Sequence, residues 1–138
     1  FASIVKYFSR GGFQIVLIGS RGEAAFVGEF ERISPVAVVN IAGRTTFEEL
    51  IDLVANCFMV FSNDTSTVHL AVAQKKPSLC VVGGGQFGVA VDYGYNDINR
   101  WVYKKTPCFF DNWRCCREVT GGKPSPCVEA VTVELTTA

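Results

Sequence analysis

The sequence predicts an α/β fold, specifically a Rossmann-like three-layer sandwich built around a parallel sheet. Short apolar runs that are typical of buried strands alternate at least three times with segments of helical periodicity. Apolar residues make up 49% and charged residues 19% of the 138 residues, a composition that fits one folded core rather than a disordered chain. Because short loops join these elements, we expect parallel strands with right-handed crossovers.

The first 40 residues are predicted to form two helices and two strands. In order, these are a helix over 1–10, a strand over 13–18, a helix over about 24–33 and a strand over 36–39. Gly11 and Gly12 end the first helix, and Pro35 stops the second. The run over 13–18 is almost wholly apolar, which predicts a strand covered on both faces of the sheet.

The helix that begins at Phe47 has the clearest pattern. Thr46 and Glu49 have the spacing of a capping box, in which each side chain bonds the other residue's backbone N–H. Apolar residues then recur at helical spacing: Phe47, Leu50, Ile51, Val54, Ala55 and Phe58. The later elements are predicted as a strand over 58–61, a helix over 70–73, a strand over 78–82 and a short strand over 100–103.

The stretch from Ser62 to His69 joins the strand at 58–61 to the next helix. A strand, a tight polar turn and a helix N-terminus favour anion binding, because the first helical N–H groups lack partners and the helix dipole adds partial positive charge. Asp64 could equally serve only as the helix cap. His69, the single histidine, lies one helical turn after Thr65 and therefore favours a functional site.

The carboxyl ends of parallel strands are where such sheets bind ligands. Four polar or glycine-bearing loops lie at those ends, and we expect them to converge on one cleft: 19–23, 40–46, 62–66 and 83–88. No G-x-G-x-x-G follows the first strand and no Walker lysine motif is present, which argues against a dinucleotide or P-loop site.

Charge and hydropathy exclude other classes of function. Thirteen basic side chains offset thirteen acidic ones, so the chain has no electrostatic footprint for nucleic acid. No run of about 18 apolar residues is available to span a membrane. The chain opens on Phe1 inside a predicted helix rather than on Met, and we therefore expect it to be a piece of a longer protein.

Several motifs, taken in order, resemble one family. Residues 41–46 (Ile-Ala-Gly-Arg-Thr-Thr) precede a helix, and 62–66 (Ser-Asn-Asp-Thr-Ser) with His69 follow about fifteen residues later. The remaining pieces are Pro77 before a strand that ends in glycine, Pro107-Cys108, Asn112-Trp113-Arg114-Cys115 and Pro126-Cys127. Their order over nearly the whole chain is similar to the C-terminal domain of glycosyltransferase family 9, the lipopolysaccharide heptosyltransferase-like enzymes.

The resemblance implies a GT-B enzyme of two Rossmann-like domains, in which the C-terminal domain holds the nucleotide-sugar donor and the N-terminal domain holds the acceptor and the general base. This chain matches only the former and lacks its opening strand and loop, which in the family supplies a basic side chain to the diphosphate. We expect residues 1–106 to be the truncated donor-binding domain, and residues 107–138 to be a cysteine-rich segment and tail of the same domain.

The resemblance also assigns roles to residues of the central turn. Asp64 and Thr65 match the family's Asp-Thr pair at the diphosphate, and Ser66 stands where the family more often has Gly. The backbone N–H of Ser66 remains available to an anion, although Ser tolerates unusual backbone angles less well than Gly. His69 matches the family's histidine one turn on, and its expected catalytic role is to stabilise the diphosphate.

Two further residues complete the expected donor site. Glu23 lies where family members place a carboxylate against the donor ribose, while a first-turn glutamate favoured by the helix dipole explains it equally well. Thr45 lies at the rim where the base would bind, beside Thr46, which is better explained as a cap. Because no Asp-x-Asp spacing is present, we expect neither a metal nor another cofactor.

The sequence thus predicts the donor-binding part of a glycosyltransferase that moves a heptose-type sugar from a nucleotide diphosphate, with ADP-heptose favoured, to a lipopolysaccharide core or similar glycan. The alternatives are another nucleotide sugar on the same fold and a nucleotide-sugar-binding module without catalysis. We expect a cytoplasmic protein, with peripheral contact to the inner face of the cytoplasmic membrane in its full-length form. The chain by itself should transfer no sugar.

The six cysteines divide between core and tail. Cys57 and Cys80 lie in apolar surroundings that predict core positions. The other four cluster toward the C-terminus: Cys108, Cys115, Cys116 and Cys127. Asp111 replaces the second cysteine of the family's Cys-x-x-Cys, so a zinc knuckle is imperfect. Free thiols packed beside Trp113 are favoured over a disulfide, which is rare in cytosolic enzymes.

Overall fold

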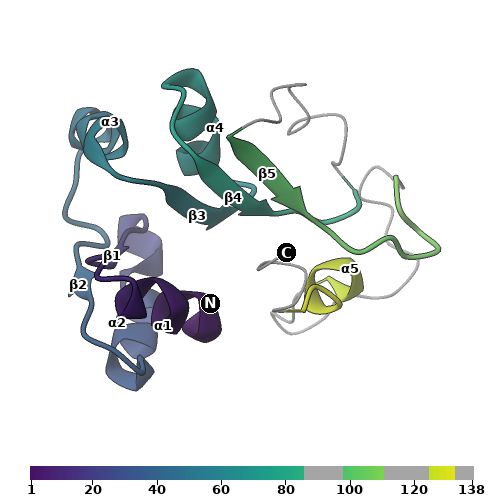
Figure 1. Ribbon diagram of the computed structural model, residues 1–138, viewed down its shortest axis with the longest axis horizontal. Coiled ribbons are helices and arrows are strands. Elements are labelled where there is room, and N and C mark those ends of the chain that lie inside the picture. The colour runs from purple at the N-terminus through teal and green to yellow at the C-terminus, as the bar shows by residue number, and fades with distance from the viewer. Residues whose placement is uncertain (86–97, 111–124, 133–138) are drawn as a thin grey trace. The chain divides into compact units, whose positions relative to one another are not determined.

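The computed structural model describes residues 1–85, 98–110 and 125–132 (Figure 1). The chain divides into two compact units, Phe1–Leu50 and Ile51–Ala138, and helix α3 (Phe47–Asn56) spans the division. Within the described ranges, no helix combines the length and the apolar character that a membrane crossing requires. The division of the domain at residue 106 stays a prediction.

The first unit contains a short parallel sheet of two strands together with helices. Its elements are α1 (Ala2–Arg10), β1 (Val16–Leu17), the 3-10 turn η1 (Arg21–Glu23), α2 (Ala24–Ile33) and β2 (Val39–Asn40). The register places Val16 opposite Val39. Helix α1 buries Ile4 and Val5 on one face and ends at Gly11, as the sequence predicted.

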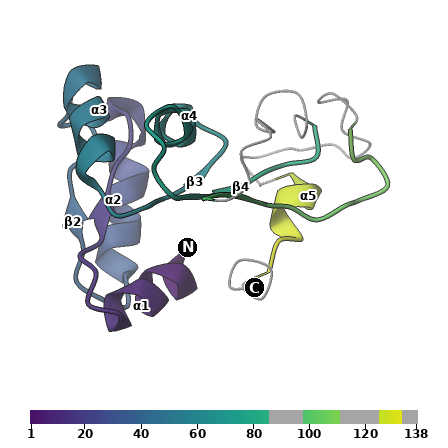
Figure 2. The same cartoon turned by 45° about the horizontal axis from the view of Figure 1, so that its top comes forward.

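The second unit is built on a parallel sheet of three strands in the order β3-β4-β5. Its remaining elements are β3 (Val60–Asn63), α4 (Ser66–Ala73), β4 (Ser78–Val81), β5 (Asn99–Val102) and α5 (Pro126–Glu129). Helix α4 packs on β3 and β4 and covers one face of the sheet (Figure 2). The loops that follow β3 and β4 begin side by side, because Asn63 pairs with Val81.

The core of the second unit lies between α4 and the sheet. Val68 and Cys80 are fully buried, Val82 is 1% exposed, and Trp101 packs against all three. At the amino end of the sheet, the buried Asn99 donates through Nδ2 to Ser78 Oγ at 2.7 Å. A buried polar group needs such a partner, because burial has removed its water.

The alternation of strands and helices, and the parallel pairing, are confirmed. The predicted strands at 13–18 and 36–39 were too long, since only Val16–Leu17 and Val39–Asn40 pair. The prediction that both faces of the strand at 13–18 are covered is wrong, because Val16 is 37% exposed, and Val39 in the partner strand is 41% exposed. An apolar run favours an extended backbone, but a partner strand must supply the hydrogen bonds that make a strand.

The capping box before α3 is confirmed. The Thr46 N–H donates to Glu49 Oε2 at 2.7 Å, and the Glu49 N–H donates to Thr46 Oγ1 at 3.2 Å. The predicted apolar face is only partly right: Val54 is buried, whereas Phe47 is exposed. Phe58 was predicted to belong both to the helix face and to the next strand. It lies between α3 and β3, in neither element, and is 65% exposed.

Candidate functional site

The joint between β3 and α4 is a turn of two residues, Asp64 and Thr65. Thr65 is the N-cap residue of α4, with the extended backbone angles φ −142° and ψ 170° that this position requires. The alternative in which Asp64 only caps the helix is therefore wrong, because Asp64 lies one residue before the N-cap position. The predicted anion-binding layout of strand, polar turn and helix N-terminus is present.

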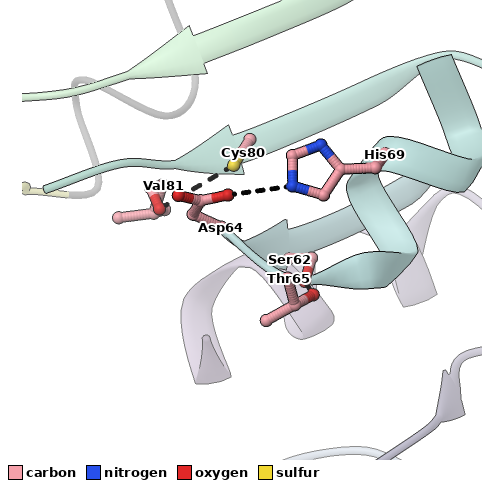
Figure 3. A network of polar contacts seen from close by, with 6 residues as sticks. All are labelled: Ser62, Asp64, Thr65, His69, Cys80 and Val81. Atoms are coloured by element: carbon pink, nitrogen blue, oxygen red, sulfur yellow. Dashed lines mark hydrogen bonds and ion pairs between the residues drawn. The ribbon is translucent and has the colours of Figure 1, made fainter. Parts of the chain in front are cut away.

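Asp64 instead faces His69. Asp64 Oδ1 lies 3.3 Å from His69 Nε2 (Figure 3). The Asp64 side chain is 17% exposed and the His69 side chain 37%, so the pair is reachable from solvent but is screened less than a surface pair. A carboxylate against one ring nitrogen fixes the orientation of an imidazole. The fold thus presents an oriented histidine at the first turn of α4.

Cys80 of β4 lies close to Asp64 (Figure 3). The Cys80 side chain is fully buried, as predicted, and burial raises the pKa of its thiol to about 12, with the negative charge of Asp64 adding to the rise. The thiol therefore stays protonated at neutral pH and does not act as a nucleophile. Its contribution at this site is packing.

Ser62, the third residue of β3, is a residue of the site that sequence reasoning missed. Its Oγ lies 2.9 Å from Thr65 Oγ1, so the two hydroxyls form a hydrogen bond across the turn. Thr65 makes no side-chain bond to the helix that it caps. The available signal was the spacing of two hydroxyl residues at i and i+3 around a predicted turn.

Glu23, in the first unit, is engaged with Ser20. Its Oε2 accepts hydrogen bonds from the Ser20 N–H at 2.8 Å and from Ser20 Oγ at 2.6 Å. These two bonds, the side-chain bond first, lower the pKa of the Glu23 carboxyl. Glu23 therefore lies in a first helical turn, as its alternative explanation stated, and it also forms a capping box with Ser20. Its role toward a ribose stays a prediction.

The loops after β1 and β2 lie side by side within the first unit. The Gly43 N–H donates to Gly19 O at 2.9 Å, and a Cβ on Gly43 would lie 3.0 Å from the Cα of Arg21. Gly43 has φ +71°, so it combines a left-handed backbone with a close approach. Thr45 follows in the same loop and is half-buried. Two of the four predicted loops thus meet here.

The structure groups the predicted site residues by unit. Asp64, Thr65, Ser66 and His69 lie together on one turn and one helix of the second unit. Glu23 and Thr45 lie on the two neighbouring loops of the first unit. That all six residues belong to one donor site stays a prediction, as does the convergence of the four loops.

The cysteines that the structure describes are Cys57, Cys80, Cys108 and Cys127, and no disulfide joins any two of these four. Cys57 is only half-buried, so its predicted core position is less complete than that of Cys80. No group of three or more metal-ligating side chains occurs among the residues with described positions. Cys115, Cys116 and Trp113 lie outside the described residues, so the zinc and free-thiol alternatives stay predictions for them.

A cavity of about 350 Å³ lies elsewhere, in the first unit. Its lining includes Phe13 and Gln14 just before β1, and Ala37 and Val38 just before β2. These residues stand at the amino ends of the two strands. Ligands of parallel α/β sheets bind at the opposite, carboxyl ends, so this cavity is not part of the candidate site.

Parallel strands with helices packed on them define a Rossmann-like α/β domain, and this one carries an acid–histidine pair at the carboxyl end of a strand. Its family follows from comparison. The chain belongs to glycosyltransferase family 9: the family model described as glycosyltransferase family 9 (heptosyltransferase) matches residues 1–112. The resemblance drawn from the sequence motifs is confirmed.

Known relatives extend well beyond this chain. Lipooligosaccharide heptosyltransferase 2 of Haemophilus influenzae is 30% identical over 87 residues, which are 60% of this chain and 25% of that protein. The corresponding protein of Haemophilus ducreyi is 32% identical over 82 residues, which are 56% of this chain and 23% of that protein. The chain therefore spans about a quarter of the length of these relatives.

A solved structure supports the fold. The structure of the E. coli ADP-heptose lps heptosyltransferase II matches this chain with a TM-score of 0.64 and 23% sequence identity. The match covers 76% of this chain and 32% of that one. The α/β Rossmann-like fold predicted from the sequence is confirmed.

Proposed function

We propose that this chain is the donor-binding part of a glycosyltransferase that moves a heptose-type sugar from a nucleotide diphosphate to a lipopolysaccharide core or similar glycan. The observation that carries the proposal is the Asp64–His69 pair at the N-terminal end of α4, directly after a parallel strand. This pair lies within the residues that the family model matches.

The chemistry follows from the charge that develops during transfer. Breaking the bond between the anomeric carbon and the diphosphate leaves negative charge on the leaving oxygen. Backbone N–H groups at the start of α4 and the His69 ring stabilise that charge more in the transition state than in the ground state, which lowers the barrier. Asp64 holds the ring in place through its contact with Nε2. This scheme needs no metal.

The donor and acceptor are proposed from the relatives. ADP-heptose is the donor that we favour, because the matched E. coli structure is that of an ADP-heptose heptosyltransferase. The acceptor is a glycolipid held by the remainder of the full-length protein, together with the general base. We place the reaction at the cytoplasmic face of the inner membrane, where such a glycolipid is accessible to a peripheral protein.

Ligand titration tests the proposal. Binding of ADP, UDP and GDP and of their sugars is measured by calorimetry and by the shift in melting temperature. In NMR titrations the amides of Thr65, Ser66 and Thr67 should move first. Shifts confined to the amino ends of the strands would contradict the proposed site.

Turnover assays separate an enzyme from a binding module. The full-length protein should transfer sugar to a lipid A-core acceptor, and the 138-residue chain should not. Binding without turnover by the full-length protein would instead support a nucleotide-sugar-binding module. Preference for UDP or GDP over ADP would support a different sugar donor on the same fold.

A further inference from the structure

The cap of helix α4 is unusual in where its hydroxyl points. Thr65 occupies the N-cap position, from which a threonine hydroxyl ordinarily accepts a bond from the second or third helical N–H. Here the Thr65 side chain makes no such bond, and its Oγ1 lies 2.9 Å from Ser62 Oγ instead (Figure 3). The Thr65 hydroxyl therefore contacts the preceding strand and forms no capping bond with its own helix.

Ser62 is well placed to hold that hydroxyl. It belongs to β3 and pairs with the fully buried Cys80 of β4, so the sheet fixes its backbone. Thr65 is exposed and belongs to a two-residue turn. A side chain on a fixed strand therefore determines the rotamer of a side chain on the turn.

We propose that Ser62 is a positioning residue for the nucleotide diphosphate: it holds the Thr65 hydroxyl away from the helix. The third helical N–H, that of Val68, donates to Thr65 O at 3.1 Å, so the N–H groups left to the phosphate oxygens are the first two of α4, those of Ser66 and Thr67. This inference rests on the proposed function. The Thr65 hydroxyl and a phosphate oxygen accept from the same backbone donors, so only one of them can occupy a given N–H at a time.

The Ser62 hydroxyl is expected to weaken the cap of α4 while it strengthens donor binding. Replacing Ser62 by Ala frees Thr65 to cap its own helix, which stabilises the protein while it obstructs the anion. Donor affinity and thermal stability should then move in opposite directions. A residue that merely supports the fold would lose both together.

The test uses the full-length protein with ADP as the probe. Ser62→Ala should raise the Kd for ADP about fivefold, the equivalent of one capping bond. The melting temperature without ligand should stay level or rise. Ser62→Thr keeps the hydroxyl and should retain the wild-type Kd. Ser34→Ala removes a hydroxyl bond in the first unit and serves as the control for a lost surface contact.

A double-mutant cycle isolates the competing hydroxyl. In a Thr65→Val background no side chain can cap the helix, so Ser62→Ala should no longer change the Kd. An unchanged Kd in Ser62→Ala alone, a parallel loss of stability and affinity, or an equal effect in both backgrounds would each overturn the inference. Failure of the wild-type protein to bind any nucleotide diphosphate would instead overturn the proposed function.

Discussion

The two units of the chain differ in how much apolar surface they bury. In the described part of the first unit, the buried apolar residues are Ile4, Val5 and Ala42. In the second they are Val54, Val60, Val68, Ala71, Cys80, Val82, Val102 and Cys127. The strands of the first unit pair over two residues each, whereas those of the second pair over four. The acid–histidine pair stands on the better-packed unit.

This difference has a functional meaning. A group that must meet developing charge has to be held within a fraction of an ångström, and packed strands and helices provide that precision. The loops of the first unit carry Glu23 and Thr45, which the family resemblance predicts to lie against the donor ribose and base. We therefore expect substitutions in the second unit to affect catalysis, and those in the first unit to affect donor affinity.

The largest expected effect is at His69. In the full-length enzyme, His69→Ala should lower kcat about a hundredfold or more, because it removes a group that stabilises transition-state charge. The melting temperature should fall only slightly, since the side chain is 37% exposed. Steady-state kinetics and a thermal melt measure both quantities.

The matched comparison is Glu23→Ala in the first unit, which should raise KM for the donor and leave kcat within a few-fold. If His69→Ala unfolds most of the protein while the remaining folded molecules keep full activity, His69 is a structural residue. Asp64→Ala should lower kcat through loss of ring orientation. It should not act through loss of a helix cap, because Thr65 holds that position.

A core substitution should separate the units by stability. Val68→Ala removes buried methyl groups from the fully packed core of the second unit and should cost about 2 kcal/mol of unfolding free energy. Val16→Ala removes the same atoms from a strand of the first unit, where the side chain is 37% exposed, and should cost well under half as much. Urea unfolding measures both, and equal losses would mean that the Val16 side chain is packed as tightly as that of Val68.

Gly43 offers a smaller backbone effect in the first unit. Gly43→Ala should cost roughly 1–2 kcal/mol, because alanine is strained in the left-handed region and its Cβ would press on the backbone of Arg21. The control is Gly28→Ala in α2, where the space around the new Cβ is open and helix propensity improves, so stability should rise. Shifts of the urea midpoint in opposite directions, the larger for Gly43→Ala, would fit the prediction, and an unchanged midpoint for Gly43→Ala would contradict it.

The smallest expected effect is the pH dependence at Glu23. Hydrogen bonds to Ser20 lower the carboxyl pKa in the folded state below its ordinary value of 4.5. The stabilisation is therefore present above that value and is lost as pH falls through the folded pKa. Glu23→Gln should reduce stability by a few tenths of a kcal/mol at neutral pH, since the group is exposed.

The melting curves of wild type and Glu23→Gln should converge in acid. Glu48→Gln, which removes a charge from the first turn of α3, is the matched control for the change in net charge. A difference between wild type and Glu23→Gln that persists below pH 3 would mean that the Ser20 bonds do not depend on ionisation.

The sequence determined the features that depend on neighbours along the chain. Thr46 and Glu49 specify the start of α3 because a capping box needs only four consecutive residues. The placement of His69 one helical turn after Thr65 likewise follows from helical spacing, and the structure brings His69 within 3.3 Å of Asp64. The motif order also identified the family, whose model matches residues 1–112.

The tertiary structure decided what depends on partners distant in sequence. The strand predicted at 13–18 is limited to Val16–Leu17, because only the residues opposite β2 form hydrogen bonds with a partner strand. Cys80 is buried and Phe58 is exposed because of which other elements pack against each side chain. The periodicity of the sequence does not predict those packing partners. The N-cap of α4 is Thr65 rather than Asp64, and the Thr65 hydroxyl contacts Ser62. Both follow because the end of β3 fixes the path of the chain into the helix.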